Sequence, residues 1–213
     1  NDFTGTLPGA YFNLNFLENL ELFNLPLYGA IASNKLCTST LNLLDITGAL
    51  FEPSNLDVAL TDTNCPKLEV LSMTIPIRSD GNDGSVPTGL SSMTNLKELY
   101  MTASYQYFDD DTNGTSNPNN GQYELQNLPT SMGDYPPNLT GLGWIAGFTG
   151  AVGNINGLYD TYTSLDTFTV DIPKWYTMGK PLRNIVNNEV TGTIPESLGE
   201  DFDRLFWLDL ANQ

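Results

Sequence analysis

The feature that most constrains the fold is an apolar pattern that recurs along the chain. The pattern is apolar-x-x-apolar-x-apolar, and its copies begin at Leu17, Leu41, Leu68, Leu96, Leu165 and Leu205. A weaker copy begins at Leu139, continues at Leu142 and has Trp144 in its third apolar place. Alternate side chains of an extended strand point the same way, so the second half of each copy predicts a short strand. Units that cannot bury their own apolar residues are expected to stack on one another.

A glycine-containing turn phrase follows many of these copies. Thr191-Gly192-Thr193-Ile194-Pro195 near the end of the chain repeats Thr4-Gly5-Thr6-Leu7-Pro8 near its start. Variants stand at Tyr28–Ile31, Thr47–Leu50, Asp83–Pro87 and Thr149–Val152. Glycine allows a tight turn, and the apolar-Pro pair then directs the chain along the next side of a coil. Strand and turn phrase together predict a stack of coils whose parallel strands lie about 4.8 Å apart.

Together these motifs resemble the leucine-rich-repeat family. The stretches Asn188–Pro195 and Asn1–Pro8 are similar to the N-x-L-x-G-x-I-P phrase of its plant-type extracellular subclass. The resemblance implies an α/β repeat solenoid with a parallel β-sheet on its concave face and little regular helix. We expect one solenoid over residues 1–213, made of about seven coils.

Two intervals between copies are too long for a single coil, and they predict insertions near residues 103–124 and 173–187. The first is rich in Asp, Asn and Gly and is expected to be a surface loop. The second contains Trp175, Tyr176 and Met178, which either pack on their own coil or contact a partner.

The first insertion holds the sharpest chemical motif of the chain. Asp109, Asp111 and Asn113 alternate ahead of Gly114, as in the opening of a D-x-D-x-N-G calcium loop. The glutamate that closes such a loop is missing, because Asn120 occupies its place. The segment is therefore either a calcium site or a solvated acidic loop, and calcium is the one cofactor that the sequence indicates.

The cysteines and sequons bear on the cellular compartment. Cys37 and Cys65 occupy nearly equivalent places in adjacent coils, so they either form a disulfide or remain two free buried thiols. Asn113 and Asn138 each begin an N-x-T glycosylation sequon. These features and the subclass resemblance predict an extracellular or cell-surface protein. The chain starts inside a turn phrase at Asn1, which suggests a processed form or a fragment, and this segment is not expected to insert into a membrane.

Charge and composition argue against several function classes. The chain has 25 acidic and 8 basic residues, for a formal net charge of −17, which disfavours a nucleic-acid partner. It contains no histidine, which excludes histidine-based catalysis and histidine metal sites. No local spacing selects a pair of carboxylates for glycosidase-type chemistry. We therefore expect a protein that is not an enzyme.

The resemblance places recognition residues between the strand leucines, on the concave face. The central place of each copy carries Glu21, Asp45, Ser72, Tyr100, Thr169 and Asp209. The place after the third apolar residue carries Phe23, Thr47, Thr74, Thr102, Asp171 and Ala211. Thr47, Thr74 and Thr102 would form a short ladder, although threonine is also simply a good strand residue. This face has no dense aromatic stripe that would identify a peptide or a sugar ligand.

Both ends of the stack are expected to expose core residues. The chain starts with a turn phrase that lacks its strand and ends with a strand that lacks its turn phrase. The residues concerned are Phe3 and Leu7 at one end and Leu205, Phe206, Trp207, Leu208 and Leu210 at the other. The expected partners are proteins, either other copies docking head to tail or further repeats of a longer polypeptide.

The predicted function is a non-catalytic extracellular module for protein interaction or assembly, including a repeating unit of a filament. One alternative is a ligand-binding ectodomain of receptor or inhibitor type. A lesser alternative is an ice-binding protein, because Thr-x-Thr pairs occur at several places, although these pairs do not share one register.

Overall fold

The computed structural model describes residues 7–23, 25, 27–31, 35–51, 53–77, 86–105, 126–127, 135–146, 148–151, 165, 167–169, 189–191 and 207–209. The first insertion beyond Tyr105 and the second insertion lie outside these residues. So do the proposed calcium ligands Asp109, Asp111 and Asn113, together with Asp171, Phe3, Leu205, Phe206 and Leu210.

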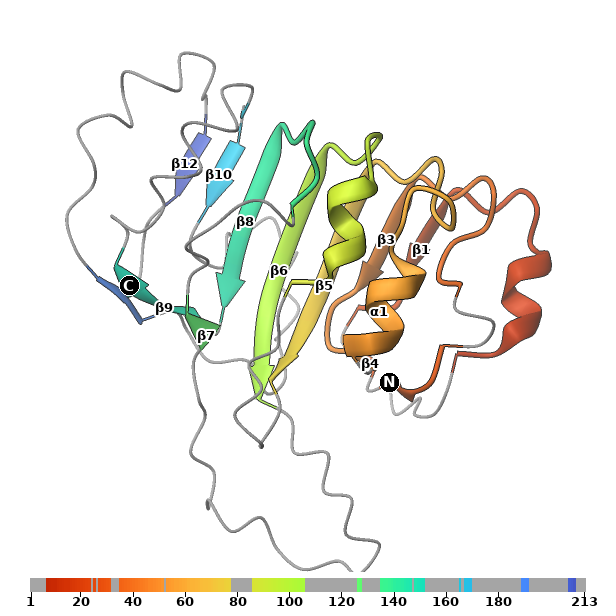
Figure 1. Ribbon diagram of the computed structural model, residues 1–213, viewed down its shortest axis with the longest axis horizontal. Coiled ribbons are helices and arrows are strands. Elements are labelled where there is room, and N and C mark those ends of the chain that lie inside the picture. The colour runs from red at the N-terminus through yellow and green to blue at the C-terminus, as the bar shows by residue number, and fades with distance from the viewer. Residues whose placement is uncertain are drawn as a thin grey trace, which may run out of the picture.

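The main feature is a seven-stranded sheet in which every described pairing is parallel (Figure 1). Its order is β1 (Asn19–Glu21), β3 (Leu43–Ile46), β5 (Val70–Ile77), β6 (Glu98–Tyr105), β8 (Gly141–Ala146), β10 (Thr167–Thr169) and β12 (Trp207–Asp209). Each strand comes from one predicted copy of the apolar pattern, and the weak copy at Leu139 supplies β8. The chain folds as a leucine-rich-repeat solenoid.

The register of the sheet aligns the predicted copies residue by residue. Leu20, Leu44, Leu71, Leu99, Leu142, Phe168 and Leu208 pair in one continuous row. Ile46, Met73, Met101 and Trp144 form the next row. The side chains of these two rows from Leu44 to Trp144 are almost entirely buried, each contributing roughly 1.5–3 kcal/mol of apolar burial.

Backbone hydrogen bonds repeat from coil to coil where each strand begins. One carbonyl in each coil accepts hydrogen bonds from two successive N–H groups of the next coil. The acceptors are Glu18, Asn42, Glu69 and Lys97, and the donor pairs are Asn42 and Leu43, Glu69 and Val70, Lys97 and Glu98, and Thr140 and Gly141. This repetition fixes the stacking register independently of the side chains.

Helical turns cover one side of the sheet. α1 (Pro53–Ala59) and the 3-10 helix η3 (Thr88–Ser92) lie in front of the strands in Figure 1, and η1 (Gly9–Asn13) lies near the N-terminal end. Asp57 Oδ1 accepts a 2.8 Å hydrogen bond from the backbone N–H of Thr88 and so ties α1 to η3. The small helical content agrees with the expectation from the sequence.

Several turn phrases pair with one another as short strands, which the sequence did not predict. β2 (Tyr28–Gly29) pairs with β4 (Leu50–Phe51). β9 (Phe148–Ala151) pairs with β7 (Gln126–Asn127) and with β11 (Glu189–Thr191). Gly48 has a φ of 87°, a left-handed conformation that glycine adopts without strain, so this turn forms as expected.

β6 extends further than the sequence indicated. Ala103–Tyr105 fall within the stretch assigned to the first insertion, but they continue β6 and pair with Ile75–Ile77 of β5. A register shift then occurs where β6 meets β8, because Met101 pairs with Trp144 while Thr102 pairs with Ala146. Ile145 is the extra residue of this irregularity and is fully buried.

The two cysteines form the disulfide that was one of the two expected states. Cys37 and Cys65 are bonded with a Cα–Cα distance of 5.1 Å, across a sequence separation of 28 residues. The bond links two adjacent coils close to the N-terminal end. A crosslink over a chain segment of this length restricts the unfolded state and stabilises the fold by roughly 3 kcal/mol.

Candidate functional site

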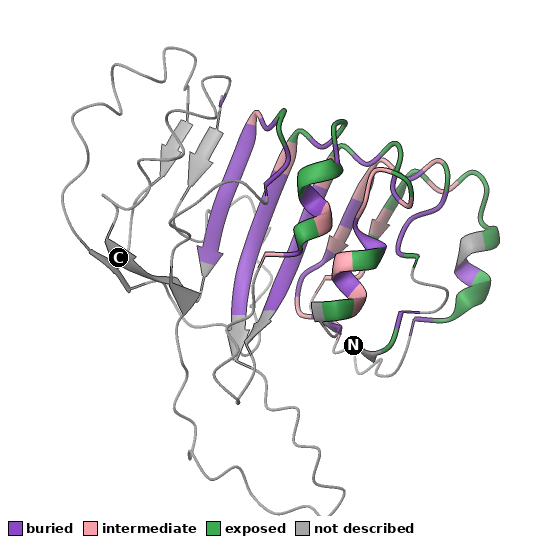
Figure 2. Cartoon of the chain, in the orientation of Figure 1, coloured by how far each residue is buried: buried purple, intermediate pink, exposed green. Residues whose placement is uncertain are grey.

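The predicted recognition residues form a row across the sheet, on the face that points away from the apolar core, but the residues in the middle of this row are buried. Glu21, Asp45, Ser72, Tyr100, Gly143, Thr169 and Asp209 pair in sequence across the sheet. Glu21 is exposed and Asp45 is half-buried, whereas Ser72 and Tyr100 are buried. Figure 2 shows the same change from exposed to buried between the edge strand and the middle of the sheet.

Two members of the predicted threonine ladder, Thr74 and Thr102, contact each other inside the protein. The hydroxyl oxygens of Thr74 and Thr102 are 2.8 Å apart, and Thr74 Oγ1 accepts a 2.7 Å hydrogen bond from the Gly48 N–H. Thr47, Thr74 and Thr102 are all buried. Their burial favours the alternative that threonine is simply a good strand residue over a recognition role.

Tyr100 occupies the sheet face beside the glycines of β8. Its hydroxyl donates a 3.1 Å hydrogen bond to Glu98 Oε2, and it would lie 3.1 Å from a Cβ built on Gly141. Gly143 is its partner on β8. The small residues of β8 thus leave room for the Tyr100 ring, which is itself buried. Among the residues of this face whose burial the structure describes, the exposed side chains are on β1, and Asp45, Val70 and Glu98 are half-buried.

The N-terminal end of the solenoid exposes residues that are core residues elsewhere. Leu14, Thr38, Cys65 and Met93 are equivalent, because each carbonyl accepts a hydrogen bond from the N–H of the leucine three residues later. Thr38, Cys65 and Met93 are buried, but Leu14 is 51% exposed. Leu17, Leu20 and Leu22 of the same coil are only partly buried.

Phe16 departs from the pattern of the later coils even more strongly. The equivalent residues in the next coils are all polar, namely Thr40, Lys67, Asn95 and Asn138. Thr40, Asn95 and Asn138 each donate a hydrogen bond to a carbonyl of the preceding coil. Phe16 has no polar group and is 96% exposed. The segment Asn13–Leu17 borders a shallow surface hollow of about 370 Å³. We call Leu14, Phe16, Leu17, Leu20 and Leu22 the N-terminal end face.

Backbone turns hold this end face in place. The Leu14 N–H donates to the Tyr11 carbonyl, and the Leu17 N–H donates to the Leu14 carbonyl, both at 3.1 Å. Tyr11 is buried, and its hydroxyl donates a 2.9 Å hydrogen bond to the Leu36 carbonyl of the next coil. The exposure of Leu14 and Phe16 therefore belongs to an anchored turn.

Burial of Tyr11 also makes the stability of the protein depend on pH in the alkaline range. Burial raises the pKa of its phenol from 10.0 to about 12, because the charged form loses solvation. The unfolded chain ionises near pH 10, so this contribution is complete below pH 10 and is lost as the pH rises to about 12. We expect the free energy of unfolding, measured by chemical denaturation at several pH values, to fall more steeply between pH 10 and about 12 in the wild-type protein than in Tyr11→Phe. An equal slope for both proteins would contradict the assignment.

The described residues contain no group of three or more His, Cys, Asp or Glu side chains that could hold a metal ion. Among the same residues, no helix is long and apolar enough to cross a membrane. Asn138 of the second sequon is exposed, and its amide donates a 2.8 Å hydrogen bond to the Thr94 carbonyl. Leu7, expected at the open end, is buried.

Comparison with known proteins gives structural similarity alone. No family model matches the sequence, and no curated protein matches it. Among solved structures, a TDR receptor has a TM-score of 0.43 and 19% identity, covering 99% of this chain and 37% of its own. The plant peptide hormone receptor RGFR1, in complex with RGF2, has a TM-score of 0.38 and 16% identity, covering 98% of this chain and 34% of its own. The chain thus spans about a third of the length of these proteins.

Proposed function

We propose that this chain is a non-catalytic extracellular module for protein interaction, and that its partner docks on the N-terminal end face. The observation that carries this proposal is the exposure of Leu14 and Phe16 at positions that are buried or polar in the following coils. Exposed apolar residues that cluster on one surface are typical of protein interaction sites. The disulfide and the exposed sequon at Asn138 support an extracellular location.

Assembly of identical copies is a second candidate for the same surface. Within the described sheet, β1 and β12 are the two edge strands, and both belong to a sheet whose pairings are parallel. A head-to-tail contact between such edges would continue the sheet and propagate into a filament. A ligand-binding ectodomain of receptor or inhibitor type would use the same end face for a different protein.

Site-specific photocrosslinking tests the proposed function. Phe16 is replaced by photoreactive benzoyl-phenylalanine, and Val58 on α1, which is also an exposed apolar residue at 47%, receives the same replacement as the control. We expect protein adducts from position 16, in the cells that secrete the chain, to exceed those from position 58 at least tenfold. Mass spectrometry of the adducts distinguishes a second copy from a different protein. Equal yields from both positions would remove the end face as the docking surface.

A further inference from the structure

The edge strand β1 determines how a partner can approach the N-terminal end face. In the described sheet β1 pairs with β3 alone, so its other edge is the place where a further strand can add. Strand addition supplies backbone hydrogen bonds, and the added strand lies about 4.8 Å away. Leu20 of β1 and Leu22, which directly follows the strand, pack against the apolar cluster of the core. An added strand must therefore present apolar residues at alternate positions to this side.

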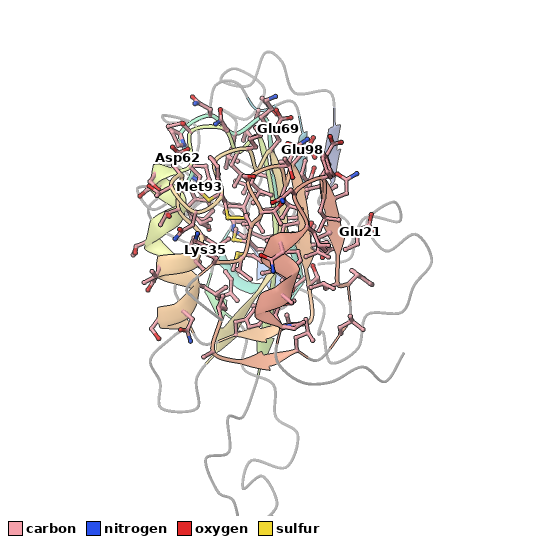
Figure 3. All side chains as sticks on the ribbon, turned by 90° about the vertical axis from the view of Figure 1, so that its right-hand side faces the viewer. Glu21, Lys35, Asp62, Glu69, Met93 and Glu98 are labelled. Carbon is pink, nitrogen blue, oxygen red and sulfur yellow. A yellow bond between two sulfur atoms is a disulfide. The ribbon has the colours of Figure 1, made fainter. Side chains whose placement is uncertain are left out.

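The other side of the same edge is acidic. Glu21 alternates with Leu20 along β1, is exposed, and pairs with Asp45 on β3. The sequence has no lysine or arginine before Lys35. Figure 3, which faces the N-terminal end, shows Glu21 on one side of the molecule and Lys35 on the other. No cation of the first coil therefore offsets the charge of Glu21.

Charge makes a second copy a poor occupant of this edge. A head-to-tail contact in register would extend the row of Asp45 and Glu21 with the residue that occupies the same row on β12, which is Asp209. Directly opposed side chains on neighbouring strands lie about 5 Å apart, where like charges destabilise the pairing. The net charge of −17 adds a general repulsion between copies.

We infer that the partner of the N-terminal end face is a basic amphipathic strand, extended and parallel to β1. Its apolar residues cover Leu14, Phe16 and Leu20, and lysine or arginine residues at the intervening positions face Glu21. This inference rests on the proposed function, since it names the chemistry of the partner that docks on the end face.

The test uses two synthetic heptapeptides with blocked ends, one alternating valine and lysine and one alternating valine and glutamate. Calorimetry and backbone amide NMR follow their binding to the full chain in about 20 mM salt, where charge is weakly screened. We expect the lysine peptide to bind and to shift the amides of residues 18–22, and the glutamate peptide not to bind. Raising the salt to about 500 mM should weaken binding severalfold, because screening shortens the range of the attraction.

Two charge variants separate a specific contact from general attraction to an acidic protein. Glu21→Lys should weaken binding of the lysine peptide at least tenfold. Glu69→Lys makes the same change of net charge at an exposed residue that forms an ion pair with Lys97, and it should weaken binding less than threefold. Equal effects of the two variants would overturn the basic-strand inference.

Two further measurements, of self-association and of the contact at Phe16, distinguish failure of this inference from failure of the proposed function. If Glu21→Lys made the chain self-associate through the end face in sedimentation velocity, the partner would be a second copy, and only this inference would fail. If Phe16→Ser left peptide binding unchanged and position 16 gave no crosslinks, the end face itself would be excluded and the proposed function would fail. Loss of binding in Phe16→Ser supports both.

Discussion

Replacing Trp144 with alanine is expected to lower the free energy of unfolding by about 4 kcal/mol. Trp144 is the largest fully buried side chain among the described residues, and it pairs with Met101 in the row that also contains Ile46 and Met73. Its indole N–H donates a 3.2 Å hydrogen bond to the hydroxyl of Tyr135, which packs edge-on against it with ring centroids 6.4 Å apart. Alanine would leave a cavity between coils that a rigid parallel sheet cannot close. Denaturant unfolding followed by circular dichroism measures the change.

Tyr135→Phe is the matched control for this prediction. It preserves the aromatic packing but leaves the indole N–H without its acceptor at Tyr135, which should cost about 1–3 kcal/mol. Trp144→Ala should therefore be clearly the more damaging change. Similar losses in the two variants would mean that the hydrogen bond, rather than the volume of the indole, stabilises this coil.

The strand rows could be predicted from the sequence because their signal is local and repeated. Leu41, Leu68 and Leu96 each start the same short pattern, and equal patterns in stacked coils must align in register. Even the weak copy at Leu139 is in its predicted place, since Leu142 pairs with Leu99. The sequence left a disulfide and two free thiols as alternatives, and the nearly equivalent positions of Cys37 and Cys65 correctly indicated that they lie side by side.

Features that depend on contacts between coils could not be predicted from the local pattern. The phrases around Gly29 and Leu50 were expected only to turn, but equivalent backbone segments in adjacent coils meet and pair. The burial of Thr74 depends on Gly48 and Thr102, which come from two other coils. A pattern read within one coil contains no information on such neighbours.

The candidate site was only partly visible in the sequence. For the N-terminal end of the stack the sequence analysis named Phe3, which lies outside the described residues, and Leu7, which is buried. The useful signal was Phe16, which stands where the later coils carry Thr40, Lys67, Asn95 and Asn138. An apolar residue at an otherwise polar position indicates a different neighbour. A comparison of the residues at the same position of every copy identifies Phe16 from the sequence.

Substituting Gly89 with alanine is expected to destabilise the protein by about 3 kcal/mol. A Cβ atom at this position in η3 would lie 2.3 Å from the Leu60 carbonyl oxygen and 2.5 Å from that of Asp57. Both atoms belong to the backbone at the end of α1, so no side-chain rotation can relieve the clash. The helical turns of two adjacent coils must move apart, which also strains the hydrogen bond from the Thr88 N–H to Asp57.

Ser91→Ala in the same turn is the control for Gly89→Ala. Ser91 is exposed, and its hydroxyl bonds only to the Thr88 carbonyl within η3, so its loss should change stability by about 0.5 kcal/mol or less. Urea denaturation of both variants gives the comparison. Gly89→Ala should in addition speed amide hydrogen exchange more in α1 and η3 than in β8, because the clash is confined to the helical side of these two coils. A Gly89→Ala protein as stable as Ser91→Ala would mean that α1 and η3 pack less closely than the backbone distances indicate.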